Sequence, residues 1–129
     1  MKYRILTNNP MVAEEFNLTH EVAYSDISAK EILGRASEGI SNGEILLNHP
    51  LYGSLKPNET PYRSLLLRKK EDISFTAITN EESAALIVKA LGAYEKFTDK
   101  KETTDTKLLK DYQVVDLSLT ASAVAAADR

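Results

Sequence analysis

The sequence predicts one α/β domain, a three-layer sandwich in which helices cover both faces of a mainly parallel sheet of four or five strands. Apolar runs of strand length alternate along the chain with segments of helical periodicity. The runs at residues 45–47 and 65–67 are continuously apolar, as in strands that are covered on both faces. The length of 129 residues suffices for one core and is too short for two.

The first half of the chain supplies strands, helices and their boundaries in a regular order. Residues 2–7 predict a buried strand, and Pro10 can open a short helix over residues 11–16. Residues 21–24 predict a second strand. Ser28 and a glutamate three residues later have the spacing of a capping box, which predicts a helix that ends near Gly43.

The second half continues with two more strands, at residues 44–48 and 63–69, and a weaker candidate at 73–78. Thr79 and Glu82 repeat the capping-box spacing before a helix with apolar residues at helical intervals. Residues 98–106 contain no apolar side chain and predict an exposed polar loop. The final segment, 107–129, fits a helix or a strand over part of its length, and its alanine-rich end favours a helix.

Composition excludes several classes of function. A net charge of -3, with basic residues interspersed among acidic ones, argues against a general nucleic-acid binder. The absence of cysteine excludes disulfides, thiolate metal sites, iron–sulfur clusters and a cysteine nucleophile. No segment has the apolar length of a signal core or of a membrane span. We therefore expect a cytoplasmic protein.

A long connector lies between the two apolar runs and contains three of the four prolines, Pro50, Pro57 and Pro61. Residues that precede proline are excluded from the helical region, so the connector should be stiff and extended. Loops of more than about 12 residues in compact domains are usually functional or disordered. The apolar and aromatic residues in this one, among them Leu51 and Tyr52, predict that it is ordered.

Polar residues follow two of the predicted strands. Asn8 and Asn9 come after the first strand, and Asn48 and His49 come after the third. Ligands collect at the carboxyl ends of strands in open α/β sheets, so the two pairs would converge if these strands are parallel neighbours. The connector would add side chains and close backbone approaches that suit a small anion. These additional candidates are Gly53, Ser54, Lys56, Asn58 and Arg63.

Structural roles compete with binding and catalysis for these residues. Asparagines beside proline commonly satisfy the backbone of turns, and a histidine at a strand end is more often structural than catalytic. We interpret His20, in a polar turn, as a surface residue. The sequence has no nucleophile elbow, no phosphate-loop spacing and no cluster of metal ligands, so we predict no metal and no cofactor.

Two stretches resemble a known family. Residues 7–10, Thr-Asn-Asn-Pro, together with Asn48-His49-Pro50, Gly53-Ser54 and the run from Lys56 to Ser64, are similar to the GrdX family. These are small proteins encoded beside the glycine, sarcosine and betaine reductases of amino-acid-fermenting anaerobes. The resemblance covers nearly the whole chain and implies a context more than a mechanism, because it brings no catalytic residues with it.

Two functions follow as hypotheses. The first is a non-catalytic accessory or small-ligand-binding protein of such a reductase system, with a small anionic metabolite or a protein of the system as its partner. The alternative is a small enzyme of acyl or phosphoryl transfer, with His49 as general base and Lys56 and Arg63 stabilising charge. A homodimer that buries the final segment is compatible with either.

Overall fold

The computed structural model describes residues 3–50, 61–69, 80–96 and 105–129. Strands and helices follow one another in the order β1 (Tyr3–Thr7), α1 (Pro10–Phe16), β2 (Glu21–Tyr24), α2 (Ala29–Ser41), β3 (Ile45–Leu46), β4 (Ser64–Arg68), α3 (Asn80–Lys96) and α4 (Thr106–Ala127). The predicted strand at 73–78 and the predicted cap Thr79 lie outside the described residues.

The sheet has four strands in the order β2-β1-β4-β3, counted over the described parts of the chain. Strand β1 is parallel to β2, and β4 is antiparallel to both β1 and β3. The prediction of a mainly parallel sheet is therefore wrong, because the sheet is mixed. The apolar run of β4 is continuous because both of its faces are covered, and this property does not depend on the direction of a strand.

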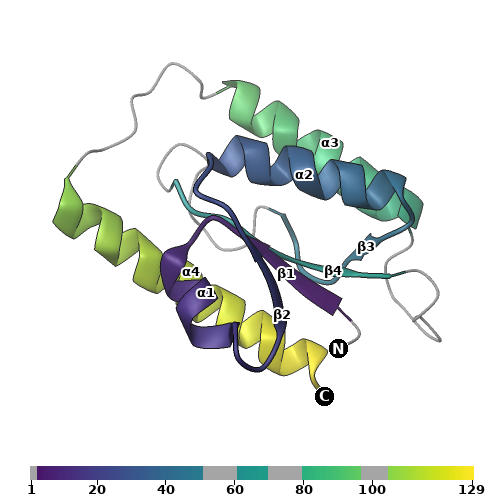
Figure 1. Ribbon diagram of the computed structural model, residues 1–129. Helices are drawn as coiled ribbons and strands as arrows, with labels where there is room; N and C mark the ends of the chain where they lie inside the picture. Colours follow the sequence, from purple (N-terminus) through teal and green to yellow (C-terminus); the bar gives the residue numbers. More distant parts are fainter. Residues whose placement is uncertain (1–2, 51–60, 70–79, 97–104) are drawn as a thin grey trace.

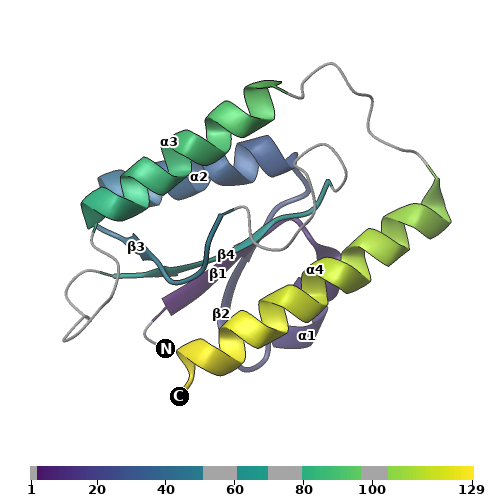
Figure 2. The same cartoon turned by 180° about the vertical axis from the view of Figure 1, so that it is seen from behind.

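Helices cover the sheet on both faces, as Figures 1 and 2 show from opposite sides. Helices α2 and α3 lie together over one face, and α1 and α4 lie over the other. Each face has its own apolar cluster. The larger one joins Ile32, Leu33 and Ile87 of the helices to Leu65 and Leu67 of β4. The smaller cluster centres on residues of β1, α1 and α4, namely Tyr3, Ile5, Val12 and Val124, together with Leu66.

The helix boundaries follow from local chemistry. Ser28 Oγ accepts a hydrogen bond from Glu31 N at 3.1 Å, and the Glu31 carboxylate accepts one from Ser28 N at 3.4 Å, so the predicted capping box at the start of α2 is present. After α2 the chain turns at Gly43, whose φ of 102° lies in the left-handed region that glycine tolerates.

The C-terminal segment, for which the sequence left helix and strand open, is helix α4. Asp105 caps it by accepting hydrogen bonds from Lys107 N and Leu108 N. The predicted polar loop at 98–106 therefore overlaps the start of this helix at its last two residues. The rest of that loop lies outside the described residues. Helix α4 is continuous from Thr106 to Ala127.

Candidate functional site

The chain passes four times through one rim of the sheet, where β2 also ends, at Tyr24 beside Thr7. Strand β1 ends there at Thr7, β3 is followed there by Asn48, and β4 begins there at Ser64. Both exits that the sequence singled out lie at this rim, because β1 and β3 run in the same direction on either side of the antiparallel β4. They are not neighbours, as β4 separates them. We call this end of the sheet the polar rim.

Asn48 extends the sheet with its side chain. Its Nδ2 donates to Ser64 O at 3.1 Å, and its Oδ1 accepts from Leu66 N at 2.9 Å. These are the positions that a backbone amide and carbonyl would occupy if β3 continued. The predicted strand at 44–48 is therefore shorter in its backbone ladder, Ile45–Leu46, than in the sequence pattern.

Asn8 joins three segments of backbone on the side of the rim that faces α2. Its Nδ2 donates to Ile27 O and to Pro61 O, both at 2.8 Å, and its Oδ1 accepts from Arg63 N at 2.9 Å. The residue is 4% exposed. Both amide hydrogens and the carbonyl oxygen of this side chain are thus engaged within the protein.

Asn9 does the same on the opposite side, beneath α4. Its Oδ1 accepts from Met11 N at 3.0 Å and caps α1, whose first residue is Pro10. Its Nδ2 donates to Gln113 O and to Asp116 Oδ2, both at 3.0 Å. A single buried amide therefore fixes the start of α1 and the position of α4.

A chain of buried hydrogen bonds continues from Asn9 through the sheet. Asn9 N donates to Thr7 Oγ1 at 2.9 Å, and Ser64 Oγ donates to Asp116 Oδ2 at 2.7 Å. The hydroxyls of Thr7 and Ser64 lie 2.7 Å apart. Because the Ser64 proton is directed to Asp116, Thr7 must donate to Ser64. All four residues are at least 96% buried.

Thr7, Ser64 and Asp116 were not among the predicted site residues, although Thr7 and Ser64 lie in the stretches that resemble the family. A signal for Asp116 is nevertheless present, since it is the lone charged residue between Val114 and Ala127. A carboxylate among apolar and small helix residues indicates a buried, hydrogen-bonded acid. Hydroxyls at the ends of apolar strands, by contrast, carry no distinguishing pattern.

Arg63 is 1% exposed and lies on the α3 side of the rim. Its Nε donates to the Tyr94 hydroxyl at 2.8 Å, and its guanidinium carbon lies 5.9 Å from the centre of the Tyr94 ring. The charge that the sequence assigned to a ligand thus takes part in the contact between β4 and α3. Tyr62, one residue earlier, accepts from Gln113 Nε2 at 2.7 Å.

The remaining candidates are less defined by the structure. His49 is exposed beside the polar rim. Gly53, Ser54, Lys56 and Asn58 belong to residues 51–60, which lie outside the described residues, so the contribution of the connector to this site stays a prediction. Within the described ranges no group of three or more histidine, aspartate or glutamate residues is placed to hold a metal ion.

His20 differs from its interpretation as a surface residue, because only 11% of its side chain is exposed. Its Nε2 lies 2.9 Å from Asp128 Oδ2, and its ring contacts those of Tyr3 and Phe16. Tyr3 also donates to Asp128 at 2.6 Å. Hydrogen bonds from Tyr3 and then from His20 lower the pKa of Asp128, whereas burial and this bond to Asp128 raise the pKa of Tyr3.

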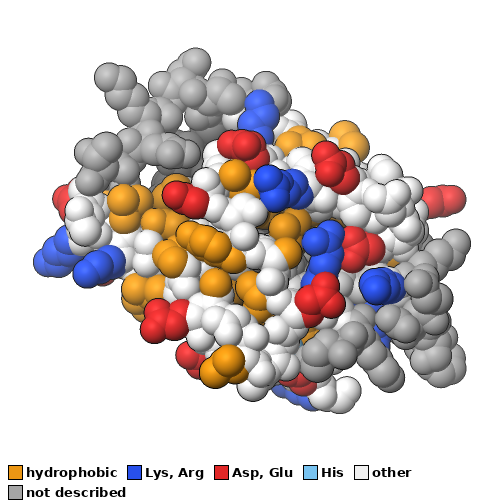
Figure 3. Space-filling model, viewed as in Figure 1, with side chains coloured by type: hydrophobic (Ala, Val, Ile, Leu, Met, Phe, Trp, Pro, Cys, Tyr) orange, Lys and Arg blue, Asp and Glu red, His pale blue; other side chains and the backbone are white. Residues whose placement is uncertain are grey.

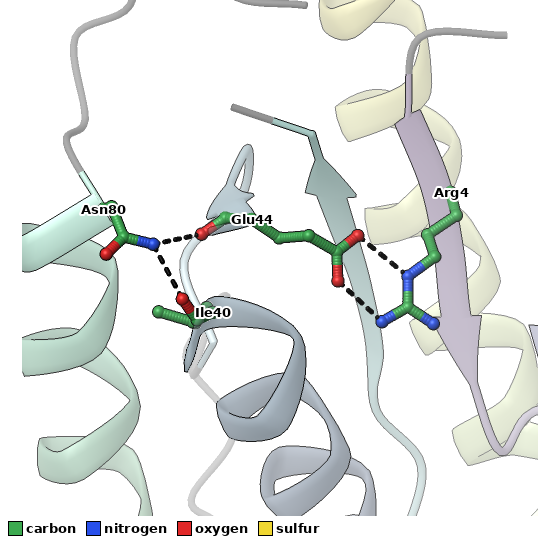
Figure 4. Close-up of polar contacts among 4 residues, drawn as sticks. All are labelled: Arg4, Ile40, Glu44 and Asn80. Atoms are coloured by element: carbon green, nitrogen blue, oxygen red, sulfur yellow. Dashed lines mark hydrogen bonds and ion pairs between the residues drawn. The ribbon is translucent and has the colours of Figure 1, made fainter. Parts of the chain in front are cut away.

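A second polar feature lies at the opposite end of β1 (Figure 4). Arg4 forms a two-pronged ion pair with Glu44, at 2.8 and 3.0 Å, and the backbone carbonyl of Glu44 accepts from Asn80 at 2.7 Å. Asn80 also donates to Ile40 O at 2.8 Å. The pair lines a cleft of about 500 Å³ between α2 and the sheet, to which Arg35 and Glu38 also contribute.

The fold and the polar rim together define a small α/β protein with a mixed sheet between two helical layers, held at one end by a buried polar network. A model of the GrdX-like protein family matches residues 4–125, so this chain belongs to the GrdX-like family. No curated protein and no solved structure matches it. In the described part of the chain, no helix has the length and apolarity needed to cross a membrane.

Proposed function

We propose that this protein is a non-catalytic accessory protein of anaerobic glycine, sarcosine or betaine reductase systems, and that it acts by binding. Its partner in this proposal is a small anionic metabolite or a protein of the reductase system. The family membership supports the association by name. The chemistry of the polar rim supports binding over catalysis.

The observation that carries the proposal is that the rim asparagines direct their side-chain hydrogen bonds to the protein itself. Asn8, Asn9 and Asn48 each bond with both ends of their amide groups to other parts of the same chain. Asn8 and Asn9 are buried, and both amide hydrogens and the oxygen of each are bonded, whereas Asn48 is half-buried. Side chains held in this way fix backbone segments and take no part in proton transfer. The polar rim then works as a rigid support for whatever binds beside it.

Among the candidates in the described ranges, His49 is the exposed one, and it follows directly on Asn48, which is fixed to β4. In our proposal a small anion binds between His49 and the connector side chains, with Lys56 supplying charge. Gly53 and Ser54 would supply backbone amides, and Asn58 a side-chain amide.

The enzyme alternative receives less support. It requires Arg63 to stabilise charge that develops beside His49. Arg63, however, is buried with its Nε on Tyr94 of α3, whereas His49 is exposed on the far side of β4 from β1.

Binding and turnover can be measured on the same purified chain. We expect phosphate, acetyl phosphate or glycine at tenfold its dissociation constant to raise Tm by about 4 °C, or a purified reductase component to co-elute with the chain. His49→Ala and Lys56→Ala should weaken the interaction at least about fivefold, because each removes a donor or charge from the site. Lys107→Ala, an exposed change on α4, is the matched control.

Two results would count against this proposal. If none of these compounds or proteins binds, the accessory role fails. If the chain alone turns over acetyl phosphate and His49→Ala abolishes that turnover, the enzyme alternative replaces it.

A further inference from the structure

Strand β2 forms one outer edge of the sheet. Ser25 N donates to Thr7 O at 3.1 Å, so the backbone of Ser25 is directed toward β1. Successive residues of a strand direct their backbone N–H and C=O groups alternately to its two sides. The backbone groups of Val22 and Tyr24 therefore point away from β1. Two residues with outward N–H and C=O groups make this edge able to pair with another strand.

The edge lies in an apolar surface. Figure 3 shows hydrophobic side chains gathered between α2 and α1, over the position that β2 occupies in Figure 1. Tyr24 is 43% exposed and Leu18, in the turn before β2, is 93% exposed. Proteins usually protect such edges with lysine, proline or a bulge. Strand β2 contains none of these, and its one charged residue is Glu21.

We propose that this edge pairs with a second copy of the chain, antiparallel and across a two-fold axis at Ala23. Val22 then lies opposite the partner's Tyr24, and the partner's Val22 lies opposite Tyr24. These are the residues with outward backbone groups, so the two pairs exchange about four hydrogen bonds. The two sheets become one continuous sheet, and Ala23, a small residue, meets its symmetry mate at the axis.

The side chains match this register on both faces. On the face of α1, valine and tyrosine lie directly opposite each other, a favourable cross-strand pair. On the face of α2, Glu21 lies opposite the partner's Ser25. Arg35 Nη1 donates to Ser25 Oγ at 3.0 Å within each chain, so Glu21 reaches the partner's Arg35. The symmetry produces this ion pair twice, and a second copy is therefore the occupant that the charges favour.

The mass of the full chain in solution tests the pairing, and sedimentation equilibrium from about 1 to about 500 μM covers the affinity expected of a small interface. We expect twice the chain mass of 14.3 kDa at high concentration. Glu21→Arg and Arg35→Glu should each raise the dimer dissociation constant about tenfold, because two attractive pairs become two repulsive ones. The double variant should bring the dimer dissociation constant back to within about threefold of the wild-type value.

Lys89→Glu, an exposed charge reversal on α3, is the control and should leave dimerisation unchanged. In the dimer, amide hydrogen exchange should slow at Val22 and Tyr24. A chain that is monomeric throughout the concentration range overturns the proposal. So does a dimer that the Glu21 and Arg35 variants leave intact, which would indicate a different surface, such as the α4 surface expected from the sequence.

Discussion

Gly39 shows how one missing side chain shapes the fold. A Cβ built at this position in α2 would collide with Glu44 Oε1 and would lie 2.9 Å from Arg4 Nη2. The ion pair between Arg4 and Glu44 therefore packs against the bare backbone of the helix. Gly34 lies in the same helix and has no atom within 4 Å of the position that a Cβ would take.

We predict that Gly39→Ala and Gly34→Ala change stability in opposite directions. Alanine is about 1 kcal/mol more favourable than glycine in a helix interior, so Gly34→Ala should be stabilising by up to that amount. Gly39→Ala should be destabilising by about 1–2 kcal/mol, because displacement of the ion pair exceeds the gain in propensity. Urea unfolding measures both. Equal effects of the two substitutions would show that the ion pair can move without cost.

Single residues also mark what the sequence could and could not predict about the site. Asn8, Asn9 and Asn48 were found because amides beside strand ends are a visible pattern. Their partners Thr7 and Ser64 were missed, because a hydroxyl that bonds across the sheet looks like any other hydroxyl in the sequence. Which competing role an asparagine takes depends on contacts made between distant segments.

At the scale of elements, the positions of strands and helices were more predictable than their directions. Strand β2 has the predicted bounds, and α2 begins at the predicted cap, since both depend on residues that are close in the sequence. The direction of β4 depends on the path of the chain between β3 and β4. The pattern SLLLR of β4 is compatible with a parallel or an antiparallel strand, so periodicity could not show that the sheet is mixed.

The C-terminal end of α4 is attached to β1 through Asp128, and this attachment should depend on pH. An acid at the C-terminus of a helix is disfavoured by the helix dipole, and here Tyr3 and His20 hold it in place. The folded pKa of Asp128 is lowered below its unfolded value of about 3.9. Its contribution to stability is therefore fully present above about pH 4 and is lost as the pH falls through the folded pKa.

We predict that Asp128→Asn lowers Tm at pH 7 and that the difference from the wild type shrinks below about pH 4. Thermal unfolding followed by circular dichroism at pH 7, 5 and 3 measures this. Asp111→Asn, an exposed change in the same helix, should show no such pattern. A deficit of Asp128→Asn that is the same at all three pH values would contradict the role of the charge.

At the scale of the whole molecule, the two layers of helices are joined to the sheet through the polar rim. Asn8 ties the rim to the start of α2, Arg63 ties it to α3, and Asp116 ties it to α4. Because these groups are buried, removing one leaves polar partners without hydrogen bonds inside the protein. Under the proposed function, the rim is therefore a scaffold beside a binding site and not the reaction centre of an enzyme.

The free energy of unfolding of Asn8→Ala, measured in urea beside that of His49→Ala, tests this view most directly. Asn8→Ala should be destabilising by about 2–4 kcal/mol, because it leaves two backbone carbonyls and one backbone amide without their hydrogen-bond partner. The exposed His49→Ala should change stability by less than about 0.5 kcal/mol. If Asn8→Ala is as stable as the wild type and loses binding of a ligand instead, Asn8 belongs to a ligand site and the scaffold interpretation is wrong.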